Sequence, residues 1–109
     1  MKSTNVIFID DKIKRAFESL AEGKYKDREL YDSINKAIDK LKADPTCGIH
    51  IPKRLIPKDY DKYTLTNLWK YNLPKAWRLT YTIEADEIRI LAIILEWMDH
   101  KNYERRFNY

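Results

Sequence analysis

Residues 67–97, NLWKYNLPKAWRLTYTIEADEIRILAIILEW, predict three consecutive strands. Leu68–Leu73 and Ala76–Ile83 alternate apolar or aromatic residues with polar ones, which is the period of a strand with one buried face. Ile88–Leu95 is apolar at both parities except at Arg89, as in a strand that is covered on both faces. We therefore expect an antiparallel meander whose third strand lies in the middle of the sheet.

The residues before this meander predict one strand and two helices. Val6–Ile9 is a short apolar run typical of an edge strand, and Asp10 or Asp11 can cap the helix that follows. That helix is expected to end at Gly23, and a longer one is expected over residues 27–44. Both helices carry apolar stripes at helical spacing, which include Phe17, Leu20, Leu30, Ile34, Ile38 and Leu41. We expect these stripes to pack against the sheet.

The predicted fold class is α+β. It combines a twisted, mostly antiparallel sheet (an N-terminal strand, two helices and a three-strand meander) with a short C-terminal helix capped by Asp99 and running through Phe107. Residues 46–63 have no clear period and are expected to form a loop, with a short strand near Ile49–Ile51. At 109 residues there is room for one hydrophobic core, so residues 1–109 are expected to form a single domain.

Composition argues against several classes of protein. Cys47 is the only cysteine, so no intrachain disulfide can form, and a reducing compartment is expected. One cysteine and two histidines do not give the spacing of a zinc site. The N-terminal apolar run is too short for a signal peptide, and no run has the length of a membrane span. We expect a cytoplasmic protein that needs neither metal nor cofactor.

Positive charge is concentrated between Lys53 and Arg78. The chain has a net charge of +4, and this interval contains seven lysines and arginines but only two acids, Asp59 and Asp61. Five aromatic residues are interspersed among the cations. Because cations contact phosphates and rings stack on bases, this pattern is typical of single-stranded RNA binding. The alternative interpretation is a solvated basic sheet face whose aromatic residues belong to the core.

The second half of the chain resembles the RelE/ParE superfamily of toxins from type II toxin–antitoxin pairs. The resemblance rests on the Lys-containing strand Leu68–Leu73, the aromatic-Arg-hydrophobic-x-Tyr strand Trp77–Ile83, and the apolar strand followed by a basic tail, Asp99–Tyr103. It implies a twisted sheet with two helices on one side. The RelE branch cleaves messenger RNA, usually on the ribosome, whereas the ParE branch inhibits DNA gyrase. A cognate antitoxin that wraps around the toxin is the implied partner in both branches, in a toxin–antitoxin hetero-oligomer.

The family pattern can be carried over residue by residue. Lys70 matches the lysine of the strand before the hairpin, and Arg78 matches the arginine that follows an aromatic residue. His100 or Lys101 falls where the family has a basic residue after the last strand, and Tyr103 falls near its tail tyrosine, at a shorter spacing. The resemblance thus implies catalytic roles for these five residues. The cations expected to bind RNA are Lys53, Arg54, Lys58, Lys62, Lys75, Arg105 and Arg106.

Cleavage of RNA without a metal requires three contributions from side chains. A base must remove the 2′-OH proton, cations must stabilise the charge on the phosphate, and an acid must protonate the 5′-oxygen. A lysine among other cations gives up its proton more readily, so Lys70 can be the base. Arg78 offers a rigid fork of donors to phosphate oxygens, and Tyr103 or His100 can supply the proton. The expected product carries a 2′,3′-cyclic phosphate or a 3′-phosphate.

The register of the hairpin decides whether the two strand cations share a face. A two-residue turn would pair Tyr71 with Arg78 and direct Lys70 to the other side of the sheet, whereas a three-residue loop over Leu73–Lys75 would pair Lys70 with Arg78. Pro74 cannot adopt the positive φ that tight hairpin turns favour. We therefore expect the longer loop and a shared face.

Three hypotheses about function follow from these observations. The main one is an endoribonuclease toxin that acts on messenger RNA, with the ribosome as a further expected partner and no cofactor. The second is a ParE-like toxin without nuclease activity that binds and inhibits DNA gyrase. The third is an inactive family member that acts as a binding module.

Overall fold

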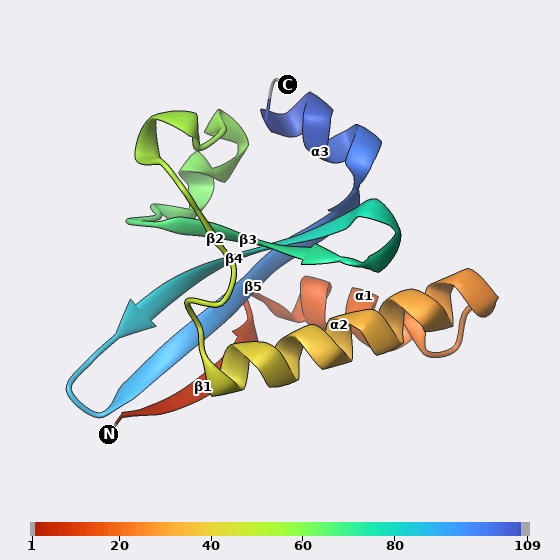
Figure 1. Ribbon diagram of the computed structural model, residues 1–109, viewed down its shortest axis with the longest axis horizontal. Helices are drawn as coiled ribbons and strands as arrows, with labels where there is room; N and C mark the ends of the chain where they lie inside the picture. Colours follow the sequence, from red (N-terminus) through yellow and green to blue (C-terminus); the bar gives the residue numbers. More distant parts are fainter. Residues whose placement is uncertain (1, 108–109) are drawn as a thin grey trace.

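A five-stranded mixed sheet in the order β1-β5-β4-β3-β2 forms the frame of the protein (Figure 1). The computed structural model describes residues 2–107. The elements are β1 (Ser3–Phe8), α1 (Asp11–Leu20), α2 (Tyr25–Ala43), β2 (Ile49–Ile51), β3 (Leu68–Leu73), β4 (Trp77–Ala85), β5 (Arg89–Asp99) and α3 (His100–Phe107). Strand β1 pairs with β5 in parallel, and the other three pairings are antiparallel. The predicted α+β class is confirmed.

Strand β5 lies inside the sheet, between β1 and β4, as its composition predicted. Four successive residues, Ala92 to Leu95, are buried, so both faces of the strand are covered. The strand continues to Asp99, four residues beyond the predicted end. Its extra length brings the start of α3 to the end of the sheet where the β3–β4 hairpin turns, because Asp99 pairs with Trp77.

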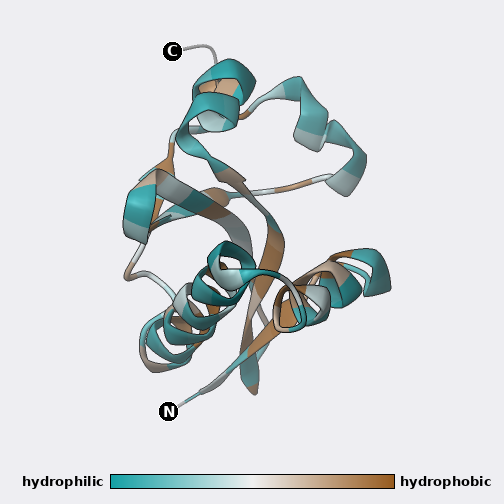
Figure 2. Cartoon of the chain, turned by 90° about the vertical axis from the view of Figure 1, so that its right-hand side faces the viewer, coloured by the Kyte–Doolittle hydropathy of each residue, from teal (hydrophilic) through white to brown (hydrophobic). Residues whose placement is uncertain are grey.

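The two long helices cover one face of the sheet, and both apolar stripes contribute to its core (Figures 1 and 2). The Asp10 carboxylate accepts a hydrogen bond of 2.8 Å from the Ile13 N–H and so caps α1. The prediction that Gly23 ends α1 was wrong, because the helix ends at Leu20 and Gly23 has no positive φ. Gly23 instead permits close packing, since a Cβ there would lie 2.6 Å from the Cβ of Asp27.

The opposite face of the sheet is covered by the segment between α2 and β3 together with α3 (Figure 1). This segment was predicted as a loop with a short strand. It contains β2 and also two 3-10 turns, η1 (Lys53–Leu55) and η2 (Lys58–Tyr63). Tyr60 of η2 and Tyr103 of α3 are each only 2% exposed and belong to a second apolar cluster. Both faces of the sheet therefore carry a core, and the second core fixes the turns and α3 in place.

Pro74–Ala76 forms a three-residue loop between β3 and β4, and Leu73 pairs with Trp77 across it. Lys75 and Ala76 adopt positive φ angles of 59° and 62°. The loop has the predicted length but starts one residue later than the predicted Leu73–Lys75. The predicted direct pairing of Lys70 with Arg78 was therefore wrong.

Candidate nucleic-acid interface

Lys70 of β3 and Arg78 of β4 converge on one aromatic ring. The Lys70 Nζ lies 4.9 Å from the centroid of the Tyr103 ring, and the guanidinium carbon of Arg78 lies 5.7 Å from it. Both distances are within the range of cation–π interactions. Lys70 pairs with Thr80 and Arg78 pairs with Asn72, so the two cations are diagonal neighbours on the same face of the sheet. The prediction of a shared face is confirmed.

Neither of these two cations is neutralised by an acid within residues 2–107. Among residues 2–107, Lys70 and Arg78 form no ion pair. Arg78 forms no ion pair with Glu84 or Asp86, and the Asp86 carboxylate instead accepts hydrogen bonds from two N–H groups of its own turn. One Arg78 Nη atom donates to the carbonyl oxygen of Trp77 at 3.2 Å. Both side chains are partly exposed, so their charges remain accessible to an anion.

The three predicted tail residues lie on α3 in different surroundings. Tyr103 is buried and packs against Phe107, with ring centroids 4.4 Å apart. His100 is exposed and its Nε2 lies 2.6 Å from an oxygen of Glu104, one helical turn away. Lys101 is exposed to solvent. Tyr103 does not belong to a solvated tail, because its ring is buried and lies beneath Lys70 and Arg78.

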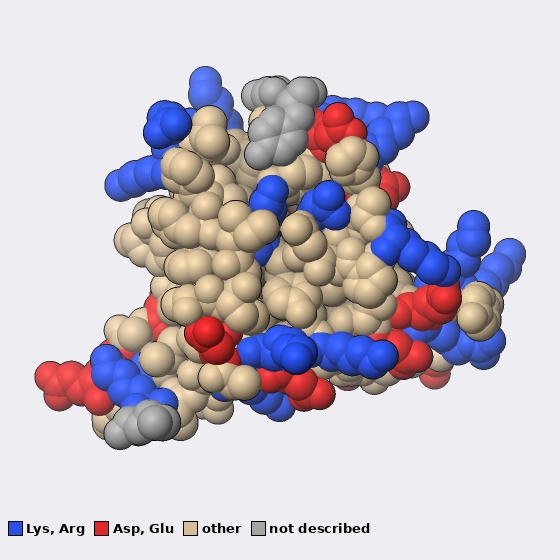
Figure 3. Space-filling model, in the orientation of Figure 1, with Lys and Arg blue, Asp and Glu red and all other residues tan. Residues whose placement is uncertain are grey.

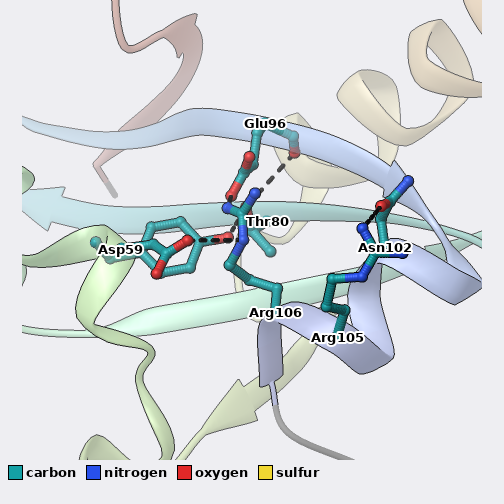
Figure 4. Close-up of polar contacts among 7 residues, drawn as sticks. Asp59, Thr80, Glu96, Asn102, Arg105 and Arg106 are labelled. Atoms are coloured by element: carbon teal, nitrogen blue, oxygen red, sulfur yellow. Dashed lines mark hydrogen bonds and ion pairs between the residues drawn. The ribbon is translucent and has the colours of Figure 1, made fainter.

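Arg106 connects three elements and holds α3 on the sheet (Figure 4). Its side chain forms ion pairs with Asp59 of η2 at 2.9 Å and with Glu96 of β5 at 2.8 Å. Burial disfavours the charge of Arg106, but the Glu96 and Asp59 carboxylates outweigh burial and raise its pKa. Arg106 was predicted to bind RNA, whereas the structure engages it in contacts between elements.

Tyr60 sits beside this ion-pair cluster. Its hydroxyl lies 3.2 Å from the Thr80 hydroxyl on β4, within hydrogen-bonding distance. Burial, together with the nearby negative charge of Glu96, raises the pKa of Tyr60 well above its ordinary value. Tyr60 is one of the five aromatic residues that the sequence predicted either to stack on bases or to belong to the core, and its burial supports the core; Asp59 and Glu96 were assigned no role. The unusual occurrence of acids within the basic segment 53–78 was the only signal that pointed to Asp59.

The remaining predicted RNA-binding cations fall into two groups. Lys53, Arg54, Lys58 and Lys62 lie on η1 and η2, and all are exposed. Arg105 is exposed on α3, where one Nη atom lies 3.4 Å from the Asn102 side-chain oxygen. Lys75 differs from these, because it projects toward α2 and forms an ion pair of 2.7 Å with Glu29. The hydrogen bond that Lys75 donates to the Glu29 carboxylate raises the pKa of Lys75. Because Lys75 is engaged in this contact, we no longer count it among the cations expected to bind RNA.

The basic residues gather on the face that carries the 3-10 turns and α3. Residues 49–63 and 100–107 together contain seven lysines and arginines and three acids, an excess equal to the net charge of the whole chain. In the space-filling view, Lys and Arg atoms project from both sides of the upper part, with acids beside those on the right, and cations and acids alternate over α2 (Figure 3). This excess of cations favours an anionic partner on the face that carries the 3-10 turns and α3.

A groove of about 720 Å³ lies between the 3-10 turns and α3. Its walls include Arg54 and Lys58 on one side and Asn102 and Arg105 on the other. Within residues 2–107, no three His, Cys, Asp or Glu side chains are grouped so that they could hold a metal ion. No helix in the same range is long and apolar enough to cross a membrane. The chain matches no protein-family model, no curated protein and no solved structure.

Proposed function

We propose that this protein is a RelE-type toxin of the RelE/ParE superfamily, an endoribonuclease that cleaves messenger RNA on the ribosome in the cytoplasm. The observation that carries the proposal is the convergence of Lys70 and Arg78 on the Tyr103 ring, with no ion-pair partner for either cation within residues 2–107. The order of strand, two helices and three-strand meander, with the helices on one face, supports the same proposal.

In the proposed reaction, RNA supplies its own nucleophile. Lys70 Nζ accepts the proton of the 2′-OH, and the 2′-oxygen attacks the adjacent phosphorus. The Arg78 guanidinium donates hydrogen bonds to the non-bridging phosphate oxygens, where negative charge increases in the transition state. The bond between phosphorus and the 5′-oxygen breaks, which leaves a 2′,3′-cyclic phosphate on one fragment and a 5′-hydroxyl on the other.

The proton for the leaving 5′-oxygen is assigned to His100. Tyr103 and His100 were both candidates from the sequence. Burial of Tyr103 favours a positioning role, in which its ring holds the two strand cations in place. His100 is exposed and directly follows Asp99. Because Asp99 pairs with Trp77, His100 lies at the same end of the sheet as Arg78. Lys101, which is next to His100, would add positive charge near the bound RNA.

The proposed partner is a cognate antitoxin with an acidic segment that covers the basic face. The excess of cations on the 3-10 turns and α3 supports this partner, because opposite charge accelerates association. Co-expression with the product of the neighbouring small open reading frame should yield a copurifying complex and relieve growth arrest. Absence of both effects would contradict the proposed pairing.

The function is tested with the purified protein in a translating extract. We expect messenger RNA to be cut at discrete positions, with 5′-hydroxyl ends on the downstream fragments. A supercoiling assay with DNA gyrase is run in parallel with the same protein preparation. Intact messenger RNA together with inhibited gyrase would overturn the proposal in favour of the ParE-like alternative. Intact messenger RNA and active gyrase would favour a binding module.

A further inference from the structure

The groove between the 3-10 turns and α3 has one wall from each of two segments that are far apart in the sequence. Arg54, Leu55 and Lys58 line it from η1 and η2, and Asn102 and Arg105 line it from α3. The walls are held together at the base, where Arg106 of α3 forms an ion pair of 2.9 Å with Asp59 of η2. The rings of Tyr60 and Phe107 also pack across the same junction, with centroids 6.1 Å apart. These contacts fix the position of the two walls relative to each other.

Some of the charged side chains that line this groove are paired with an opposite charge, and others are not. Arg106 and Asp59 neutralise each other within the groove wall. Arg54 and Lys58 are exposed and form no ion pair with any residue between 2 and 107, and the same holds for Arg105. Three cations thus face a concave surface without an acid of the described residues in ion-pair contact. Such an arrangement attracts an extended anion more strongly than isolated surface cations do.

The groove is large enough to hold part of a polyanion. Its volume of about 720 Å³ lies in the range of sites that enclose drug-sized ligands. The substrate of the proposed reaction is single-stranded RNA, so a single strand is the polyanion expected beside this groove. Exposed Leu55 adds apolar surface beside the cations, against which a ribose or the edge of a base can pack.

We propose that this groove binds the phosphodiester backbone of single-stranded RNA beside the cleaved position. The inference deepens the proposed endoribonuclease function and rests on it for the identity of the nucleic acid. Helix α3 connects the two places, because Tyr103 faces Lys70 and Arg78 while Asn102 and Arg105 face the groove. RNA that follows α3 contacts Arg54, Lys58 and Arg105 with phosphates that do not react. These residues contribute to affinity, not to the chemical step.

The test measures RNA binding separately from cleavage. The probe is a fluorescein-labelled single-stranded oligoribonucleotide of about ten nucleotides, within the site size of known single-strand binders, with 2′-O-methyl riboses that prevent cleavage. Fluorescence anisotropy gives the Kd between roughly 50 and 200 mM salt for the parent and for a triple variant, Arg54→Ala, Lys58→Ala and Arg105→Ala. The matched control replaces three exposed cations of α1, as Lys12→Ala, Lys14→Ala and Arg15→Ala.

Each phosphate contact contributes about 0.7 to the slope of log K against log salt for single strands, so the triple variant should lower the slope by about 2. The α1 variant should retain the parent slope. Circular dichroism checks folding, and each single variant, with an expected loss of about 0.7, provides the same test if the triple variant does not fold.

Three results would overturn the inference. One is a parent protein that does not bind the oligonucleotide, and another is a parent slope that persists in the groove variants. The third is tighter binding of a duplex or of an acidic peptide, such as polyglutamate, to the same groove. Failure of the proposed nuclease function gives a different result. In that case the parent protein binds the probe through the groove but leaves messenger RNA intact, so the RNA-binding groove is supported and the nuclease activity is not.

Discussion

Lys70 and Arg78 both lie over the Tyr103 ring from adjacent strands, although neither is the backbone partner of the other. The diagonal arrangement leaves Asn72 and Thr80 as their cross-strand partners. Two cations over one ring repel each other, and their attraction to the electron-rich Tyr103 ring offsets part of that repulsion. An anion bound between them would offset it further.

The first prediction concerns the two strand cations. Arg78→Ala removes donors that are most valuable in the transition state, so cleavage of messenger RNA should slow by about 100- to 1000-fold. Lys70→Ala should be similarly severe, on the order of 100-fold or more, because it removes the base. Cleavage is measured in a translating extract with variants whose folding is verified by circular dichroism.

Matched controls exist for both substitutions. Arg89→Ala removes an exposed arginine at the start of β5, and Lys36→Ala removes an exposed lysine on α2. Both control variants should cleave at the parent rate. Folded Arg78→Ala and Lys70→Ala proteins with parent activity would eliminate this site.

The second prediction separates the ring of Tyr103 from its hydroxyl. If the ring positions Lys70 and Arg78, Tyr103→Phe should retain most of the activity, and Tyr103→Leu should lower kcat by about 10-fold or more in protein that is still folded. His100→Gln should lower kcat by on the order of 100-fold with little change in KM, because it removes the proposed acid. Loss of activity in Tyr103→Phe, with normal activity in His100→Gln, would assign the proton transfer to Tyr103 instead.

The sequence pattern predicted the meander, both long helices and the shared face of the two strand cations. The loop is one residue later than predicted, which moves the partner of Arg78 from residue 70 to Asn72. Because this shift equals the two-residue period of a strand, each side chain stays on its predicted face. The prediction of the face was therefore less sensitive to the exact loop than the prediction of the pairing.

The second core was beyond the reach of sequence periodicity. Residues 53–55 and 58–63 form 3-10 turns, which are too short to show a helical repeat, and the burial of Tyr60 depends on α3 at the other end of the chain. The sequence therefore contained no sign that Arg106 differs from the other cations of the basic tail. Only its contacts with Asp59 and Glu96 distinguish it from its neighbour Arg105.

The third prediction follows from this difference between neighbouring arginines. Arg106→Ala removes two ion pairs and leaves the partly buried Glu96 without its ion-pair partner, so we expect the free energy of unfolding to fall by about 1–2 kcal/mol. Arg105→Ala, the matched control, should change it by less than about 0.5 kcal/mol because the side chain is exposed. Urea denaturation measures both values. Equal stability of the two variants would show that Arg106 does not hold α3 on the sheet.

The fourth prediction concerns Tyr60 at alkaline pH. Its ordinary pKa is 10.0, and burial raises the pKa in the folded protein. A raised pKa contributes stability that is fully present below the pKa of the unfolded chain and is lost as pH rises toward the folded value. Above pH 10 the parent should therefore lose stability relative to Tyr60→Phe by up to about 1.4 kcal/mol per pH unit.

The comparison with Tyr60→Phe isolates this residue, because all other titrating groups, including buried Tyr81, are common to both proteins. Near pH 7 the difference in the free energy of unfolding should be about 1 kcal/mol, from the Tyr60–Thr80 hydrogen bond. Urea denaturation at several values between about pH 7 and pH 11 gives the profile. Tyr25→Phe is the control, since Tyr25 is 68% exposed and its substitution should leave the profile unchanged. A constant difference between parent and Tyr60→Phe across this range would mean that the Tyr60 hydroxyl reaches water, and that η2 is not closed over the sheet.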